Sequence, residues 1–160
     1  MNAPAPDAER ETLMFFLAAQ RASVLAIVDG LDDDQLVRSV VPSGWSPASM
    51  IEHLGDAERA WFRTVVAGLP FDDGDRVCPR SVAEMLDYYR AETIHSDEIL
   101  AATSLDARPA ARPLVDIGIA ADAMTVRDVV LHLIEETARH AGHLDIAREL
   151  IDGRTGLGPR

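Results

Sequence analysis

Four long stretches of the chain carry apolar residues at helical spacing, and each stretch is bounded by residues that start or stop a helix. Gly30 ends the first stretch. Ser46 followed by Pro47 opens the second, because serine caps a helix and proline costs no hydrogen bond in its first turn. Capping boxes that begin at Ser81 and Thr125 open the other two. The predicted helices span about residues 7–29, 46–67, 81–103 and 125–152.

The segments between these helices are long for a helical protein. They cover residues 31–44, 69–80 and 104–124. A single helical turn is expected at 32–36, and Leu114–Ile119 is the only brief strand candidate. Asp7 is expected to cap the first helix, after a disordered lead-in at residues 1–6. Four amphipathic helices with long connections predict an all-α four-helix bundle that forms one domain over residues 1–160.

The charge and cysteine content exclude several classes of function. The chain of 160 residues has a net charge of −12 and contains no lysine. Phosphate binding needs clustered positive charge, which is absent here, so neither nucleic acid nor an anionic membrane is an expected partner. Cys78 is the only cysteine, which excludes an intrachain disulfide and a cysteine-based zinc site. The N-terminus lacks the pattern of a signal peptide, so a cytoplasmic location is expected.

The fourth predicted helix places two ionisable residues among its apolar ones. Its apolar stripe consists of Val126, Val129, Leu133, Leu144, Ala147 and Ile151. Glu136 and His140 fall in the middle of this stripe, one turn apart, while His132 and His143 lie on its shoulder. A carboxylate in an apolar stripe costs several kcal/mol unless it is paired, protonated or bound to a metal. Glu136 therefore requires a compensating partner.

The spacing of Glu136 and His140 allows the two side chains to share one metal ion. His53 is the best candidate for a third ligand, because it lies near the start of the second helix and beside its apolar stripe. Two histidines and one glutamate, with water in the remaining positions, are typical of a catalytic zinc site and also suit iron or nickel. The alternative is a hydrogen-bonded core pair without a metal, and periodicity alone leaves both interpretations open.

Two segments of the chain resemble a known family. They are GWSPASMIEHLGDAERAWF at residues 44–62 and EETARHAGHLDIARELIDG at residues 135–153. The chain resembles the DinB-like superfamily, and within it the actinobacterial mycothiol-dependent S-transferases and the N-terminal domain of maleylpyruvate isomerases. The resemblance implies a four-helix bundle in which His53, Glu136 and His140 hold a divalent metal ion. Zinc is the first expectation, and nickel, iron and manganese are the alternatives.

The resemblance also implies an activity. The expected enzyme joins a low-molecular-weight thiol, such as mycothiol, to a small electrophile, because a metal-bound thiol loses its proton at neutral pH. Arg139, His143 and Glu58 are candidate neighbours that would orient the ligands or the substrate. One alternative is a metal-dependent hydrolase that activates water, and another is a non-catalytic metal-binding or interaction protein. Since relatives are often dimeric, a homodimer is also expected.

Overall fold

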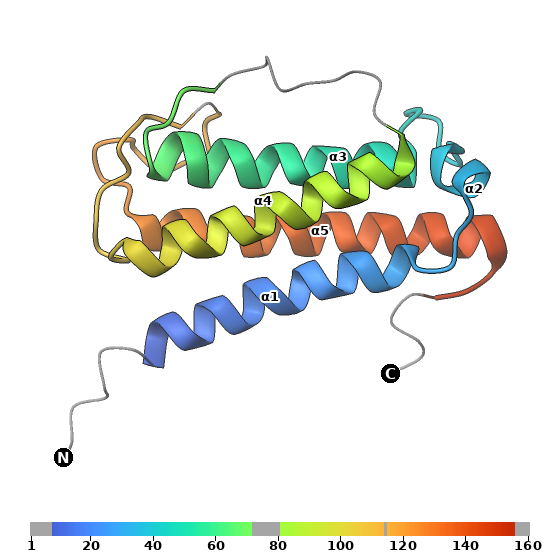
Figure 1. Cartoon of the computed structure of the whole chain (residues 1–160), viewed down its shortest axis with the longest axis horizontal. Coiled ribbons are helices and arrows are strands. Elements are labelled where there is room, and N and C mark those ends of the chain that lie inside the picture. The colour runs from blue at the N-terminus through green and yellow to red at the C-terminus, as the bar shows by residue number, and fades with distance from the viewer. Residues whose placement is uncertain (1–7, 72–80, 114, 156–160) are drawn as a thin grey trace.

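The computed structural model describes residues 8–71, 81–113 and 115–155, and all regular structure within these residues is helical. Four long helical rods run side by side, and a short helix lies at one end of the bundle (Figure 1). This arrangement confirms the predicted all-α bundle. The expected cap Asp7, the lead-in before it and the loop that contains Cys78 lie outside the described residues. That the whole chain forms one domain stays a prediction.

The helix boundaries follow the local signals in the sequence. The helices are α1 (Ala8–Val28), α2 (Asp33–Val37), α3 (Pro47–Glu58), η1 (Arg59–Val66), α4 (Val82–Ala102) and α5 (Val126–Asp152). The Ser81 hydroxyl accepts a hydrogen bond from the backbone N–H of Glu84, and the backbone N–H of Thr125 donates to the Asp128 carboxylate. Gly153 ends α5 in a left-handed conformation that favours glycine. The predicted starts and ends of the four long helices within the described residues are confirmed.

The second half of the second rod is a π-helix. Helix α3 continues into η1, where the backbone N–H of Ala67 donates to the carbonyl of Phe62, five residues earlier. The sequence predicted the extent of this rod but took all of it to be α-helical. Because a π-helix has a wider turn, the side chains after Glu58 point in directions that α-helical spacing does not predict. Such segments are rare and occur frequently at functional sites.

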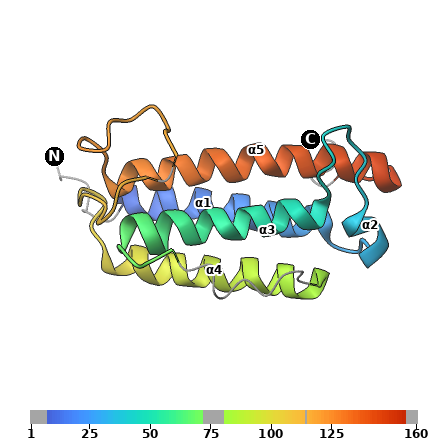
Figure 2. The ribbon, with the colours of Figure 1, turned by 90° about the horizontal axis from the view of Figure 1, so that it is seen from above.

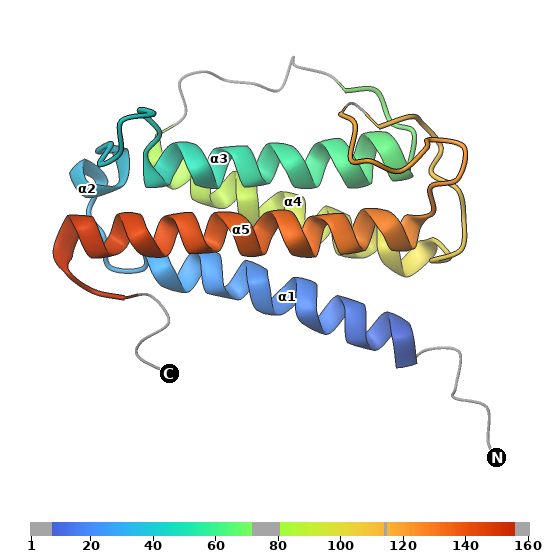
Figure 3. The same cartoon turned by 180° about the vertical axis from the view of Figure 1, so that it is seen from behind.

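Helix α1 packs mainly against α5, and α3 packs mainly against α4 (Figures 2 and 3). The core contains two apolar clusters, one that includes Leu17 and Phe62 and another that includes Val24 and Leu54. Buried polar residues lie between the two clusters along the bundle. They are Arg21, Glu58, Arg59, Glu92, Ser96 and Thr137. The rods therefore hold a polar layer within an otherwise apolar core.

Helix α1 is the only described helix whose length and mean hydropathy, 1.4 over its best window, would allow it to cross a membrane. This is weak evidence, because a core helix of a soluble protein has the same properties. Helix α1 buries Leu17, Val24, Ile27 and Val28 and carries the buried, charged Arg21. These features are those of a helix packed in a bundle.

The connection between α4 and α5 lies over the end of the bundle at which η1 ends and α5 begins (Figure 3). Its backbone is anchored by hydrogen bonds from the N–H groups of Ala110 and Ala111 to the carbonyls of Val66 and Val65. The segment 115–119, which belongs to the brief strand candidate, contains no strand. It instead forms part of the wall of a cavity beside α5.

Candidate metal centre and adjoining cavity

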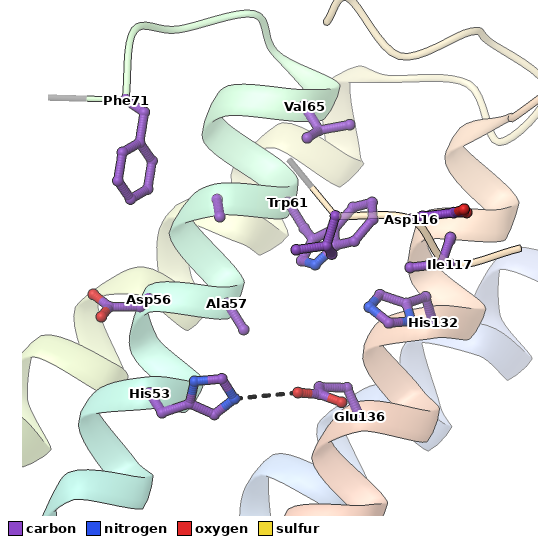
Figure 4. Close-up of a pocket in the computed structure, with 12 residues that line it drawn as sticks. His53, Asp56, Ala57, Trp61, Val65, Phe71, Asp116, Ile117, His132 and Glu136 are labelled. Carbon is purple, nitrogen blue, oxygen red and sulfur yellow. Dashed lines mark hydrogen bonds and ion pairs between the residues drawn. The ribbon is translucent and has the colours of Figure 1, made fainter. Parts of the chain in front are cut away.

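Three side chains from two helices meet on one side of the bundle. His53 lies on α3, and Glu136 and His140 lie one turn apart on α5. Nε2 of His53 is 3.2 Å from Oε1 of Glu136 (Figure 4), and Nε2 of His140 is 3.0 Å from the same oxygen. Their ligand atoms lie within 4.8 Å of one another, and no other such group of three is found among the described residues. We call these residues the α3–α5 cluster.

The cluster lies at the edge of the core. The side chains of Glu136 and His140 are 18% and 15% exposed, and that of His53 is 52% exposed. The sequence pattern placed Glu136 and His140 in the middle of the buried stripe, but the buried positions at this level belong to Thr137 and Ala141. The reason is that α5 packs mainly against α1, whereas Glu136 turns toward α3. The expectation of a centrally buried carboxylate was therefore wrong.

The electrostatic environment favours neutral imidazole beside an ionised carboxylate. Burial lowers the pKa of His140, and the neighbouring Glu136 only partly opposes this effect. For Glu136, burial acts to raise the pKa, but hydrogen bonds and charge interactions with His53 and His140 outweigh it, so the net pKa lies below its ordinary value. Ligation of a metal requires neutral imidazole and ionised carboxylate, which are these protonation states.

The donor atoms of the cluster also suit a metal ion chemically. Both imidazole Nε2 atoms converge on one carboxylate oxygen, so all three side chains direct lone-pair atoms into the same small space. A set of two nitrogens and one carboxylate suits zinc, with open positions left for other ligands, and it also suits iron, nickel or manganese. The residues therefore fit a divalent ion.

His143 is the predicted neighbour that lies beside the cluster. Its Nδ1 is 3.3 Å from Nδ1 of His140, on the ring edge opposite the Nε2 that contacts Glu136. The Trp45 ring lies 6.2 Å from that of His143, centroid to centroid. Metal-binding histidines are usually held by a partner at their second nitrogen, and His143 has this position relative to His140.

The other two predicted neighbours lie elsewhere. Arg139 forms an ion pair with Glu135, and both side chains are more than half exposed on the outer face of α5. Glu58 is 1% exposed, and its two oxygens accept hydrogen bonds from Nε and Nη2 of Arg21, each at 2.7 Å. The expectation that Glu58 supports the cluster was therefore wrong, because this carboxylate faces α1.

A cavity of about 390 Å³ adjoins the cluster and is bordered by His53 and Glu136 (Figure 4). Its other lining residues come from α3, η1, α5 and the two long connections. They are Asp56, Ala57, Ala60, Trp61, Val65, Phe71, Val115, Asp116, Ile117 and His132. A concave, mostly apolar space beside a few convergent polar groups is the usual form of a small-molecule site.

His132 lines this cavity; the sequence pattern placed it on the shoulder of the apolar stripe, as a residue beside the ligands or on the surface. Its ring lies 4.6 Å from the Trp61 ring, centroid to centroid, and burial lowers its pKa despite the acidic Glu136 and Glu135 nearby. His132 precedes Glu136 by four residues, the spacing that links Glu136 to His140. This repeat of ionisable residues at helical spacing was the signal in the sequence that could have identified it.

Comparison with known proteins gives a match to one family model. No curated protein and no solved structure gives a match. A comparison with models of protein families matches residues 12–153 to the family described as mycothiol-S-transferase, a DinB-like branch. The match includes both sequence segments that carry the resemblance, and it supports the expectation that the protein is an enzyme. The chain belongs to the mycothiol S-transferase family.

Proposed function

We propose that the α3–α5 cluster binds one divalent metal ion and that the protein uses this site to join mycothiol, or a closely similar thiol, to a small electrophile. The observation that carries the proposal is the convergence of three ligand atoms at the edge of a cavity, two of them on α5 and the third on His53, which precedes Glu136 by 83 positions in sequence. Membership in the mycothiol S-transferase family supports the type of reaction.

The side chains of the cluster have distinct roles in this proposal. His53 and His140 supply neutral Nε2 atoms, and Glu136 supplies the negative charge. A divalent ion bound by these groups would lower the pKa of a coordinated thiol, so that a nucleophilic thiolate exists at neutral pH. The chain itself then needs no catalytic cysteine. The adjoining cavity holds the electrophile close to the cluster.

His143 is a positioning residue in this scheme. When Nε2 of His140 faces the metal, the ring proton is on Nδ1, and this N–H donates to Nδ1 of His143 at 3.3 Å. The contact fixes the tautomer and the ring orientation of His140. A homodimer and a cytoplasmic location, both expected from the sequence, stay predictions.

The first test is the metal content of the purified, untagged protein and of a His140→Ala variant, measured by elemental analysis. We expect about one equivalent of a divalent metal per chain in the wild type and loss of that metal in the variant. The matched control is His95→Ala, because His95 is a half-exposed histidine on α4, outside the cluster. Helical content measured by circular dichroism must stay unchanged in both variants. A wild-type protein that binds no metal, even after incubation with zinc and nickel, would overturn the proposal.

The second test is turnover. In a mixture of the metal-loaded protein, mycothiol and an uncharged aryl halide, the free thiol of mycothiol should be consumed faster than in the same mixture without protein. The metal-free protein and His140→Ala should not accelerate the reaction. A separate assay offers the metal-loaded protein an ester or amide substrate. Cleavage of that substrate without thiol consumption would instead assign a hydrolase activity to the same cluster.

A further inference from the structure

The wall of the cavity beside the α3–α5 cluster contains an imidazole that the proposed function does not use, that of His132. We propose that His132 is a further catalytic residue, which accepts the proton of the thiol when the sulfur attacks the electrophile. This inference rests on the proposed function, because it assigns the base for that same reaction. It is carried by the position of the ring and by the partners of the other polar groups in the wall.

The His132 ring is held next to the cluster by its helix and by one aromatic contact. His132 precedes Glu136 by one turn of α5, which places the two Cβ atoms about 5–6 Å apart. Both side chains point from α5 toward the rod that carries His53 and Trp61 (Figure 4). The Trp61 ring is 5% exposed and lies 4.6 Å from that of His132, centroid to centroid, so it restricts the rotation of the imidazole. A ligand in the cavity therefore meets this ring beside the cluster.

The other polar groups of the cavity wall already have partners. Two of them belong to the α3–α5 cluster, where their lone pairs would bind the metal ion. The Asp56 carboxylate accepts a hydrogen bond from the Tyr88 hydroxyl at 3.0 Å, and that of Asp116 accepts one from the backbone N–H of Gly118 at 2.8 Å. The ring nitrogens of His132 take part in no hydrogen bond or ion pair with the residues that the structure describes. His132 is therefore the base in this wall that has a free lone pair.

A proton acceptor must be neutral before the reaction. Burial lowers the pKa of His132 and outweighs the opposite effect of Glu136 and Glu135, while Arg139 acts in the same direction as burial. The positive charge of a divalent ion on the cluster would also favour the neutral ring. The other titratable groups around the ring, which line the cavity or the adjoining hollow, are His53, Asp56, Asp116 and Asp128.

The proposed step balances for an electrophile that carries a leaving group, such as an aryl halide. Neutral His132 takes the proton from the thiol sulfur, and a sulfur lone pair forms the new carbon–sulfur bond. The carbon–halogen bond breaks, and its electron pair leaves with the halide. The imidazolium then gives its proton to water, because the side chain is only half-buried. The net change converts a thiol and an aryl halide into a thioether, a halide ion and a proton.

Two substitutions separate proton transfer from packing. His132→Phe keeps a ring against Trp61 but has no lone pair, and His132→Gln stays polar but is not a base near neutral pH. With mycothiol and an uncharged aryl halide, we expect both variants to keep one equivalent of metal and the wild-type KM for thiol. Their kcat should fall by about 100-fold or more. A His132→Phe variant with the kcat of the wild type would reduce the role of the ring to packing and overturn the inference.

Chemical rescue tests the same role in another way. His132→Ala removes the ring and leaves space beside Trp61, so imidazole added to the solution should restore part of the lost rate. The same addition should not change the rate of His95→Ala, the control variant outside the cavity. A slow His132→Ala variant that imidazole does not accelerate would count against proton transfer by this ring and overturn the inference.

A further readout does not depend on turnover. Proton–nitrogen NMR of the histidine rings in the metal-free full chain should show neutral His132 at pH 7. In the zinc-loaded chain, mycothiol without an electrophile should shift the ring signals of His132 and leave those of His95 unchanged. A protonated His132 ring at pH 7 in the metal-free chain would overturn the inference, and so would ring signals that saturating mycothiol does not move.

The outcomes for His132 and for the proposed function are distinguishable. A wild-type protein that binds metal and consumes mycothiol, together with an equally active His132→Gln variant, would contradict only the role of His132. A wild-type protein that binds no metal would contradict the proposed function, and the role of His132 would fall with it.

Discussion

Two glutamates, Glu58 and Glu136, illustrate how similar polar pairings serve different purposes in this bundle. Glu58 lies in the polar layer of the core, is 1% exposed and binds Arg21 through both of its oxygens. Glu136 lies at the edge of the core, and Oε1 of this residue contacts two imidazoles. Both carboxylates join separate helices, but only Glu136 borders a cavity.

The identity of the partners explains the difference. Arg21 is a permanent cation whose planar group matches a carboxylate, so the pair is fully satisfied and has no capacity for a further ligand. Histidine can lose its proton and offer a lone pair, so the group around Glu136 can exchange internal hydrogen bonds for a metal ion. Burial with a permanent counter-ion therefore marks a structural pair, whereas partial exposure with titratable partners marks a candidate site.

The largest expected effect is the loss of stability when the ion pair between Arg21 and Glu58 is broken. Glu58→Ala leaves the guanidinium of Arg21 buried, with only the half-exposed Asp97 as an acidic contact. We expect a loss of roughly 3–5 kcal/mol in the free energy of unfolding, measured with urea. The double variant Arg21→Met, Glu58→Leu removes both charges and should recover most of this loss. A single variant that loses less than about 1 kcal/mol would show that the pair is not structurally important.

For Glu136 we expect the opposite result, a large loss of metal affinity with a small loss of stability. Glu136→Gln keeps the shape of the side chain but removes its charge, and we expect metal affinity to fall by more than the 10–100-fold that changing an outer partner typically costs. The free energy of unfolding of the metal-free protein should change by less than about 1 kcal/mol, because the group is partly exposed. Competition with a chromogenic chelator measures the first quantity, and urea unfolding measures the second. A large stability loss with unchanged metal affinity would make Glu136 a structural residue like Glu58.

A smaller effect on metal affinity is expected at His143, which contacts His140. His143→Ala removes the partner of His140 Nδ1 and should lower metal affinity by roughly 10–100-fold without abolishing binding. His143→Gln retains a side chain that can accept the hydrogen bond, and it should recover part of the affinity. The same chelator competition, with His95→Ala as the control, provides the measurement. Equal affinity in wild type and His143→Ala would remove His143 from the scheme.

The smallest effect provides a scale for the other three, because Asp128 is a carboxylate at the start of α5 that belongs neither to the Arg21–Glu58 pair nor to the α3–α5 cluster. Hydrogen bonds from the Thr125 hydroxyl and backbone N–H hold the pKa of Asp128 below its ordinary value of 3.8. Its stabilising contribution is therefore complete above pH 3.8 and is lost as the pH falls through the lower pKa of the folded state.

We expect Asp128→Asn to lower the free energy of unfolding by up to about 1 kcal/mol at pH 7. The difference from wild type should shrink as the pH falls below 3.8. Urea unfolding at several pH values measures both quantities. A difference that is constant across this range would mean that the charge of Asp128 does not cause the effect.

The parts of the molecule that could be predicted from the sequence are those with local causes. Ser46, Ser81 and Thr125 start their helices through contacts three residues away, and Gly153 ends α5 through its own backbone angle. The spacing of Glu136 and His140 is likewise a local property of one helix. These features need no knowledge of the other helices.

The parts that could not be predicted depend on contacts between distant segments. His53 and Glu58 are five residues apart, yet one faces α5 and the other binds Arg21 on α1. The partner of Glu58 lies 37 residues away in sequence, and no local pattern identifies it. The cavity wall at 115–117 likewise arises only when the rods and the long connection are assembled.

The long connection between α4 and α5 has a consequence for how such proteins diversify. Val115, Asp116 and Ile117 line the cavity from this irregular segment, whereas His53, Glu136 and His140 stand on regular helices. Irregular surface segments accept insertions and substitutions far more readily than packed helices do. A relative can therefore keep the α3–α5 cluster unchanged while substitutions or insertions in the connection alter the shape of the adjoining cavity and the ligand that fits it.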